Sequence, residues 1–293
     1  MGGAKSPPFF MKNKVGYYFL IPTIILLIFT SIYPLLYSFI YSFYNWNWGE
    51  QKDYIGLQNY IFLLTDKEFW IVIRNTFLFA SLACFFEVSL GIILALYIDR
   101  IKIGSTIIRT ILLIPLMASG IIVSMMSKVI FNNLFGVVPF YLKKIGLKSS
   151  FFGSSDAAMP TLIGVDVWWQ TAFVFIIILA GLQSIPQEPI ESARIEGATE
   201  WQITRYIRLP MIKSLVLLVI IFRSIDTLKI FDLVWGITGG GPGISTEVVQ
   251  TYSYRLAFGF LQMSKSMTVM ILFSSVVISL TLIYSLIEKR NND

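Results

Sequence analysis

The chain has 293 residues, of which 56% are hydrophobic and 14% are charged. A typical soluble domain is about one-quarter charged, so we expect lipid to surround much of this chain. The sequence contains no histidine and one cysteine, Cys84. This composition excludes histidine-based acid–base catalysis, histidine metal sites and intrachain disulfides. The net charge of +6 is small for a nucleic-acid-binding chain and fits a membrane protein with basic cytoplasmic edges, so we predict no nucleic-acid partner.

Six apolar segments are each long enough to cross a membrane, which takes about 20 residues as a helix. All but the fifth contain at most two charged residues, and the six cover residues 15–43, 75–98, 107–131, 158–183, 211–236 and 266–287. The sequence therefore predicts an all-α membrane protein with a transmembrane domain over 15–287 and short tails at 1–14 and 288–293. The first segment is too long for a cleaved signal peptide, and no small-residue cleavage site follows it.

Six spans place both termini on one side of a cell membrane. With the N-terminus inside, the cytoplasmic segments hold twelve basic residues and the outer segments hold nine. This bias favours cytoplasmic termini. An aromatic cluster after the first span, Tyr41, Tyr44, Trp46 and Trp48, is typical of a membrane–water interface in contact with lipid.

The loop between the fourth and fifth spans, residues 184–213, is the most polar part of the chain. Pro186 and Pro189 suit a helix start, because the first helical N–H groups have no partner within the helix. Gly197 is expected to end this helix, and a second helix is predicted over 198–207, before Pro210. A short cytoplasmic helix–glycine–helix can dock into a groove of another protein or lie on the lipid surface. The physical chemistry alone leaves both open.

The loop carries the pattern E-x-A-x3-G-x9-I-x-L-P, formed by Glu191, Ala193, Gly197, Ile207, Leu209 and Pro210. This pattern resembles the "EAA" loop of permease subunits of ATP-binding-cassette (ABC) importers, with Ser192 in place of the second alanine. Further stretches resemble the carbohydrate-importing branch of that family, in particular its maltose-permease-like first subunit. They are residues 56–60, 74–76, 180–186, 231–233, 238–242 and 246–247.

The resemblance implies a type I ABC importer permease fold with a cytoplasmic coupling helix that sits in a cleft of an ATPase. It assigns contact with the ATPase to Glu191, Ser192, Ala193, Gly197, Ile207, Leu209 and Pro210. It also implies partners: a second permease in a heterodimer, two cytoplasmic ATPase subunits and an extracellular sugar-binding protein. The substrate would be a sugar or oligosaccharide.

Nucleotide chemistry is expected to belong to a separate chain. A phosphate-binding P-loop requires G-x4-G-K-[ST], and this pattern is absent from the sequence; the glycine-rich stretch 239–243 has no lysine. We therefore predict that ATP and Mg²⁺ are bound by the ATPase, that this chain holds no cofactor or metal, and that it is not an enzyme.

Ionisable residues inside spans are energetically unfavourable and usually face a cavity or a partner. In the fifth span, Arg223, Asp226, Lys229 and Asp232 recur every three residues with alternating sign. They are expected to pair along the helix or to line a pathway. Glu87 and Lys128 are expected to pair across helices or to line the path.

The resemblance to the maltose importer also assigns substrate-contacting positions on two spans. Counted from the loop without gaps, these positions are Asp166, Trp169, Gln170 and Phe173 in the fourth span, and Arg223, Asp226, Thr227 and Ile230 in the fifth. Each set has i, i+3, i+4, i+7 spacing and therefore shares one helix face. Aromatic rings can stack on sugar rings, and the polar side chains can bind hydroxyls. Most of these side chains differ from those of the maltose protein, so maltose itself is not the expected substrate.

Two other transport functions remain open. One is an ABC permease for an anionic sugar derivative, such as a uronate oligosaccharide or glycerol phosphate, because Arg223 and Lys229 lie in the fifth span. The other is an ion-coupled secondary transporter, which would require inverted repeats and paired broken helices; the sequence shows neither.

Overall fold

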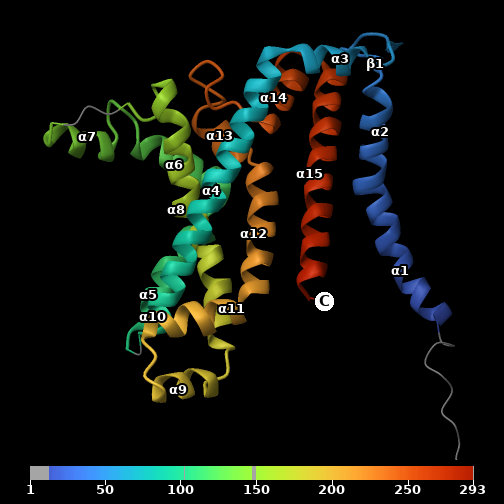
Figure 1. Ribbon diagram of the computed structural model, residues 1–293. Helices are drawn as coiled ribbons and strands as arrows, with labels where there is room; N and C mark the ends of the chain where they lie inside the picture. Colours follow the sequence, from blue (N-terminus) through green and yellow to red (C-terminus); the bar gives the residue numbers. More distant parts are fainter. Residues whose placement is uncertain (1–12, 102, 147–149, 293) are drawn as a thin grey trace, which may run out of the picture.

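The computed structural model describes residues 13–101, 103–146 and 150–292, and most of them are helical (Figure 1). In these ranges the strands are β1 (Tyr44–Asn45) and β2 (Asp53–Tyr54), which form an antiparallel hairpin that pairs Tyr44 with Tyr54. The predicted helical class is therefore confirmed, with one very small hairpin added.

Four helical segments are long and apolar enough to cross a membrane. The first, Tyr18–Tyr41, runs through α1 (Asn13–Leu27), the π-helix η2 (Ile28–Ile32) and α2 (Tyr33–Tyr41). The others are α4 (Lys67–Asp99), α8 (Ser155–Gln183) and the first part of α15 (Met263–Asn292), up to Leu282. A fifth candidate consists of two segments, Ser105–Met117 and Gly120–Ile130, that meet at 95°. By length and composition the structure thus has four or five spans, where the sequence predicted six.

The two remaining predicted spans are broken in the structure. Residues 107–131 form α5 (Ser105–Leu113), the 3-10 helix η3 (Pro115–Met117) and α6 (Gly120–Ile130). Residues 211–236 are divided among α11 (Leu209–Met211), α12 (Lys213–Leu228) and α13 (Asp232–Ile237). The 16 residues of α12 extend about 24 Å at 1.5 Å per residue, which is less than the ~30 Å hydrocarbon core of a bilayer.

The short elements gather at the two ends of the long helices (Figure 1). One end, called the α9 end below, carries α9 (Glu188–Ile195), α10 (Glu200–Ile203), the π-helix η4 (Thr204–Arg208) and α11. The opposite end, called the α3 end, carries the hairpin, α3 (Gln58–Thr65), α14 (Val249–Tyr254) and the π-helix η5 (Arg255–Gly259). The helix α7 (Val137–Lys144) lies to one side of α6.

The helices α4 and α8 form the centre of the molecule. They pack against each other over much of their length, and α12 packs against α4. Their first turns are capped by side chains: Asp66 accepts a hydrogen bond from the Glu68 N–H at 3.0 Å, and Ser154 accepts one from the Ala157 N–H at 3.3 Å, which satisfies N–H groups without helical partners. By contrast, the segment Tyr18–Tyr41 has no buried residue in its most apolar stretch and lies beside α15 (Figure 1).

Candidate functional site

The loop 184–213 folds as a helix, a glycine turn and a second helix. Pro189 lies in the first turn of α9, as expected for a residue without an N–H group. Gly197 has φ +85°, a left-handed conformation that glycine adopts without strain, and it separates α9 from α10. Thr199 and Gln202 form a reciprocal capping box that fixes the start of α10.

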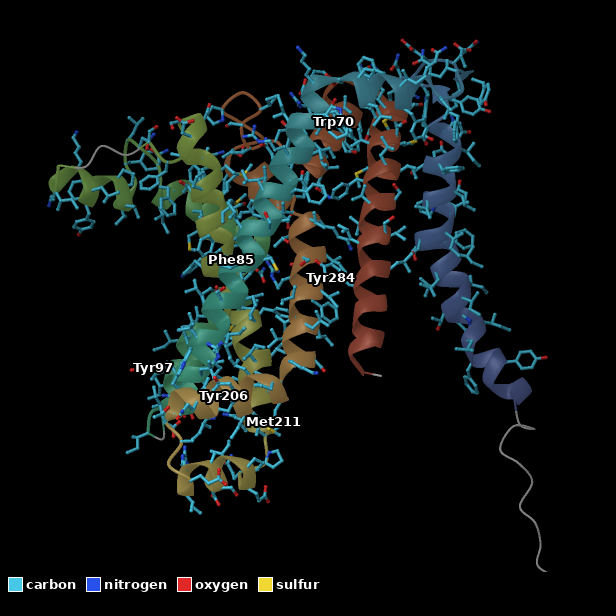
Figure 2. All side chains as sticks on the ribbon, viewed as in Figure 1. Trp70, Phe85, Tyr97, Tyr206, Met211 and Tyr284 are labelled. Carbon is cyan, nitrogen blue, oxygen red and sulfur yellow. The ribbon has the colours of Figure 1, made fainter. Side chains whose placement is uncertain are left out.

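Two isoleucines attach this loop to the helical core. Ile190 of α9 and Ile203 of α10 are buried in one apolar cluster with Ile98 of α4 and Leu182 of α8. On the outer surface of the loop, Ile195, Trp201 and Tyr206 are exposed, and Ile195 is 88% exposed. Figure 2 shows Tyr206 at the same end of the molecule as Tyr97 of α4. The loop therefore presents an aromatic and apolar surface that the described part of the chain does not cover.

The predicted coupling residues fall into two groups. Glu191, Ser192, Gly197 and Pro210 are exposed, so they are available to a partner. Ala193, Ile207 and Leu209 are half-buried and pack against the apolar cluster of the core. Ala193 therefore faces inward in this conformation, whereas Ile195, two residues later, points outward.

Ion pairs that the sequence did not suggest tie the loop to α4. Arg208 Nη1 lies 3.5 Å from Asp99 Oδ2, and both side chains are largely buried. Arg100, which directly follows α4, donates a hydrogen bond to Thr204 Oγ1 at 3.1 Å and lies 4.0 Å from Glu200. An acidic–basic pair at the end of a span is the one sequence signal that could have indicated these contacts.

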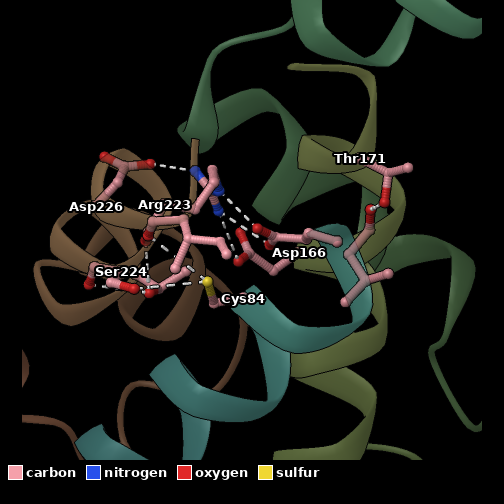
Figure 3. A network of polar contacts seen from close by, with 10 residues as sticks. Cys84, Asp166, Thr171, Arg223, Ser224 and Asp226 are labelled. Carbon is pink, nitrogen blue, oxygen red and sulfur yellow. Dashed lines mark hydrogen bonds and ion pairs between the residues drawn. The ribbon is translucent and has the colours of Figure 1, made fainter. Parts of the chain in front are cut away.

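A buried ion cluster joins three helices midway along α4. Arg223 of α12 donates to Glu87 of α4 through Nε at 2.5 Å and through Nη2 at 2.9 Å. Its Nη2 also lies 3.5 Å from Asp166 Oδ2 of α8, and its Nη1 donates to Asp226 (Figure 3). Glu87 is 0% exposed and Arg223 3% exposed. The cross-helix partner of Glu87 is thus Arg223, whereas Lys128 makes no ion pair with the residues that the structure describes.

The prediction that Arg223, Asp226, Lys229 and Asp232 pair with one another along the fifth span is wrong beyond the first pair. Arg223 and Asp226 do pair, but α12 ends at Leu228 and Asp232 begins α13. Because the chain leaves the helix at 229–231, the three-residue period does not continue on one helix face. Neither Lys229 nor Asp232 forms an ion pair within the described ranges.

The ion cluster forms one wall of a cavity of about 250 Å³. Every predicted pathway residue except Phe173 lines it; Phe173 packs against the apolar cluster near the α9 end instead. The complete lining is Asp166, Trp169, Gln170, Arg223, Asp226, Thr227, Lys229, Ile230, Phe231 and Asp232.

This lining combines rings with hydrogen-bonding groups. The indole N–H of Trp169 donates to the Ala118 carbonyl at 3.2 Å, which holds the ring in place. The carboxylates outnumber the cations, with three of the former and two of the latter. The cavity can therefore stack a ring and bind hydroxyl groups, and its charge does not favour an anion.

The glycine-rich stretch after α13 is held against α4. Asn75 Nδ2 donates to the carbonyls of Ile244 and Glu247 at 3.0 and 3.2 Å. Glu247 is buried, and this burial raises the pKa of its carboxyl, an effect that the nearby Arg255 guanidinium opposes. The stretch is thus a fixed turn on α4, and it contains no phosphate-binding lysine.

Comparison with known proteins identifies the family. Residues 87–293 match the family described as the binding-protein-dependent transport system inner membrane component, which is more than half of the chain. The chain belongs to this family. This permease is 33% identical over 244 residues to the probable ABC transporter permease protein y4oQ of Sinorhizobium fredii, covering 82% of this chain and 79% of that protein. It is 29% identical over 289 residues to the trehalose/maltose transport system permease protein MalF of Thermococcus litoralis, covering 97% of each.

A solved structure has the same fold. The bacterial alginate ABC transporter in complex with an alginate pentasaccharide-bound periplasmic protein matches with a TM-score of 0.84 and 25% identity over 96% of each chain. The predicted ABC importer permease and its type I fold are therefore confirmed. Permease subunits of this kind are not enzymes and hold no cofactor, because nucleotide is bound by the separate ATPase.

Proposed function

We propose that this permease is one half of the membrane pathway of a sugar importer. A second, different permease would complete the pathway, an extracellular binding protein would deliver the sugar, and two ATPase subunits would dock on the loop 184–213. The observation that carries this proposal is the loop itself, which is fixed to α4 and α8 by Ile190 and Ile203 and leaves Trp201 and Tyr206 exposed. Aromatic side chains of this kind commonly anchor protein interfaces.

The sugar assignment is supported by relatives and by the cavity. The relative from Thermococcus litoralis is named as a trehalose/maltose permease. The cavity offers Trp169 and Phe231 as rings together with Gln170 and Thr227 as hydrogen-bonding groups, which suits a sugar. We infer that Asp166, Trp169, Gln170, Arg223, Asp226, Thr227 and Ile230 face the substrate path, whereas Phe173 packs in the apolar cluster near the α9 end.

A neutral sugar is favoured over an anionic one. The Arg223 guanidinium already contacts three carboxylates, Glu87, Asp166 and Asp226, so little of its charge is available to a substrate. The remaining cation of the lining, Lys229, is offset by Asp232. The alginate transporter shares the fold, and an anionic substrate stays the second candidate on that ground.

The orientation follows from the position of the loop. Because an ATPase acts in the cytoplasm, the α9 end would be cytoplasmic in the cell membrane. The described start of α1 and the end of α15 lie toward the same end (Figure 1), so both termini would be cytoplasmic. On this view α12, extended by the turn to α13, completes a sixth crossing although it is short.

Replacing Gly197 by aspartate tests the coupling role. Gly197 has φ +85° and open space around the position of a side chain, so the aspartate would both strain the turn and add a charge to the docking surface. We expect Gly197→Asp to abolish uptake of labelled trehalose, lactose or maltotetraose by cells that express the complete transporter. Membrane insertion and sugar capture by the binding protein should be unchanged.

Gly49 provides a matched control. It has φ +89° and open space around it, but it lies in the turn between β1 and β2 at the α3 end. We expect Gly49→Asp to leave uptake largely intact. Normal uptake by Gly197→Asp, measured at equal expression, would contradict the assignment of the loop to the ATPase.

A further inference from the structure

A row of aromatic side chains continues from the pathway cavity toward the α3 end. Phe231, in the turn before α13, lines the cavity. Its ring centroid lies 5.4 Å from that of Tyr254 in α14, and the Tyr254 ring lies 4.8 Å from Phe258 in η5. Trp235 of α13 stacks on Phe231 with 11° between the planes. Phe231 and Trp235 lie four residues apart at the start of α13, and Tyr254 and Phe258 lie four residues apart on the continuous helical stretch of α14 and η5. The contacts of Phe231 and Trp235 with Tyr254 join these two pairs and result from the tertiary fold.

The outer rings are not part of a closed core. Phe258 is 64% exposed, and Trp235 and Tyr254 are also exposed. Large apolar side chains that remain uncovered and contiguous commonly mark a binding surface. Of these rings, Tyr254 and Phe258 border a shallow hollow of about 290 Å³, which is lined by Phe231, Tyr254 and Phe258 together with Gln250, Ser253, Ala257, Ser266 and Met270. Phe231 therefore forms a wall shared by this hollow and the pathway cavity.

The hollow also contains polar groups suited to hydroxyls. Gln250 Oε1 is buried and has no hydrogen-bond donor among the described residues. Ser253 Oγ and Ser266 Oγ lie 2.8 Å apart and share one hydrogen bond, which leaves acceptor capacity on both oxygens. An unsatisfied buried acceptor is unfavourable unless a ligand or water supplies a donor. A sugar ring, with apolar C–H faces and hydroxyls at its rim, matches this mixture of rings and acceptors.

We propose that this hollow is a second carbohydrate subsite, which holds the third ring of a neutral oligosaccharide whose first two rings lie at the pathway cavity. This inference rests on the proposed function, since it assumes that the cavity admits a sugar. The substrate would stack on Tyr254 and Phe258 and donate a hydroxyl hydrogen bond to Gln250. The subsite therefore favours oligosaccharides over disaccharides, because a disaccharide does not extend beyond Phe231 into the hollow.

The test compares sugars of different length in the complete transporter. Proteoliposomes that contain this permease, its partner permease, the ATPases and the binding protein are supplied with labelled trehalose, lactose or maltotetraose. We expect Tyr254→Leu and Phe258→Leu each to lower the ratio of tetrasaccharide to disaccharide uptake by about two- to tenfold, the effect of one aromatic stacking contact. Phe258 is mostly exposed, so its replacement leaves the fold intact even if Tyr254→Leu impairs assembly.

Two control variants separate stacking from structure. Tyr254→Phe keeps the ring and should keep the ratio, whereas Tyr254→Leu keeps only apolar bulk. Phe85→Leu removes an exposed ring of α4 that borders neither the pathway cavity nor the hollow. This variant should leave the ratio of tetrasaccharide to disaccharide uptake unchanged. An unchanged ratio in both Phe258→Leu and Tyr254→Leu, or an equal loss for both sugar lengths, would overturn the subsite and assign the rings to lipid or to the second permease. A wild-type transporter that takes up none of the three sugars would instead defeat the proposed function.

Discussion

At the scale of single residues, Arg223 shows how a charge is accommodated among apolar helices. An unpaired ion in this setting would be strongly destabilising. The guanidinium of Arg223 makes a bidentate contact with Glu87 and also contacts Asp166 and Asp226, so this one side chain links α4, α8 and α12. The three carboxylates differ in setting: Glu87 is fully buried, whereas the side chain of Asp226 is 66% exposed.

This difference predicts unequal effects of two substitutions. Glu87→Ala removes the buried partner of Arg223 and should destabilise the permease by roughly 3–5 kcal/mol, as expected for one half of a buried ion pair. Asp226→Asn removes an exposed partner and should cost less than about 1 kcal/mol. Thermal unfolding of the purified transporter in detergent measures both. Equal shifts in melting temperature would show that Glu87 does not hold Arg223 in the way the geometry indicates.

At the scale of elements, α4 connects the loop 184–213 with the cavity. Near the α9 end, Asp99 pairs with Arg208 and Ile98 packs in the same cluster as Ile190. Twelve residues earlier on the same unbroken helix, Glu87 binds Arg223 beside the cavity. A rigid helix that is held at both points is a physical route by which a displacement of the loop reaches the cavity.

We therefore expect Asp99→Asn to weaken coupling. Uptake should fall by about tenfold, within the usual range of coupling between sites, while ATP hydrolysis by the complex is largely kept. Asp99→Glu should restore part of the uptake, because it retains the charge that pairs with Arg208. Uptake and hydrolysis are measured on the same proteoliposomes.

The neighbouring residue supplies the comparison. Arg100 also contacts the loop, but its pair with Glu200 is exposed and 4.0 Å long. Arg100→Gln should therefore have only a small effect. If Arg100→Gln and Asp99→Asn reduced uptake equally, the buried pair would have no special part in transmission.

Some elements could be predicted from the sequence because the signal is local. Gly197, Pro189 and the polarity of 184–213 identify the helix–glycine–helix, since each residue acts on its own backbone. The break at 229–231 could not be predicted in this way. Its residues are Lys229, Ile230 and Phe231, which include neither proline nor glycine, so no local residue signal marks the end of the helix.

At the scale of the whole molecule, seven of the eight positions that the resemblance to the maltose importer assigns line one cavity, whereas hydropathy predicted six spans where four or five are found by length and composition. Positions at i, i+3, i+4 and i+7 of two helices came together because a helix face is a geometric consequence of its period. Phe173 was the exception, because at the last position of its set it meets the apolar cluster near the α9 end. The pairing of Asp99 with Arg208 could not be assigned from the sequence: charges at the end of a span suggest an ion pair, but the choice of partner depends on the tertiary fold.

The whole molecule also predicts the energy source of transport. Under the proposed function, the driving force comes from a separate ATPase that docks on the loop surface of Ile195, Trp201 and Tyr206, which is open to a partner. In proteoliposomes of the complete transporter, we expect uptake of labelled sugar to stop when vanadate blocks ATP hydrolysis or when Mg²⁺ is chelated. Ionophores that collapse proton and sodium gradients should leave uptake unchanged. Uptake that persisted in vanadate but failed with the ionophores would instead indicate an ion-coupled secondary transporter, in which the exposed loop would need another explanation.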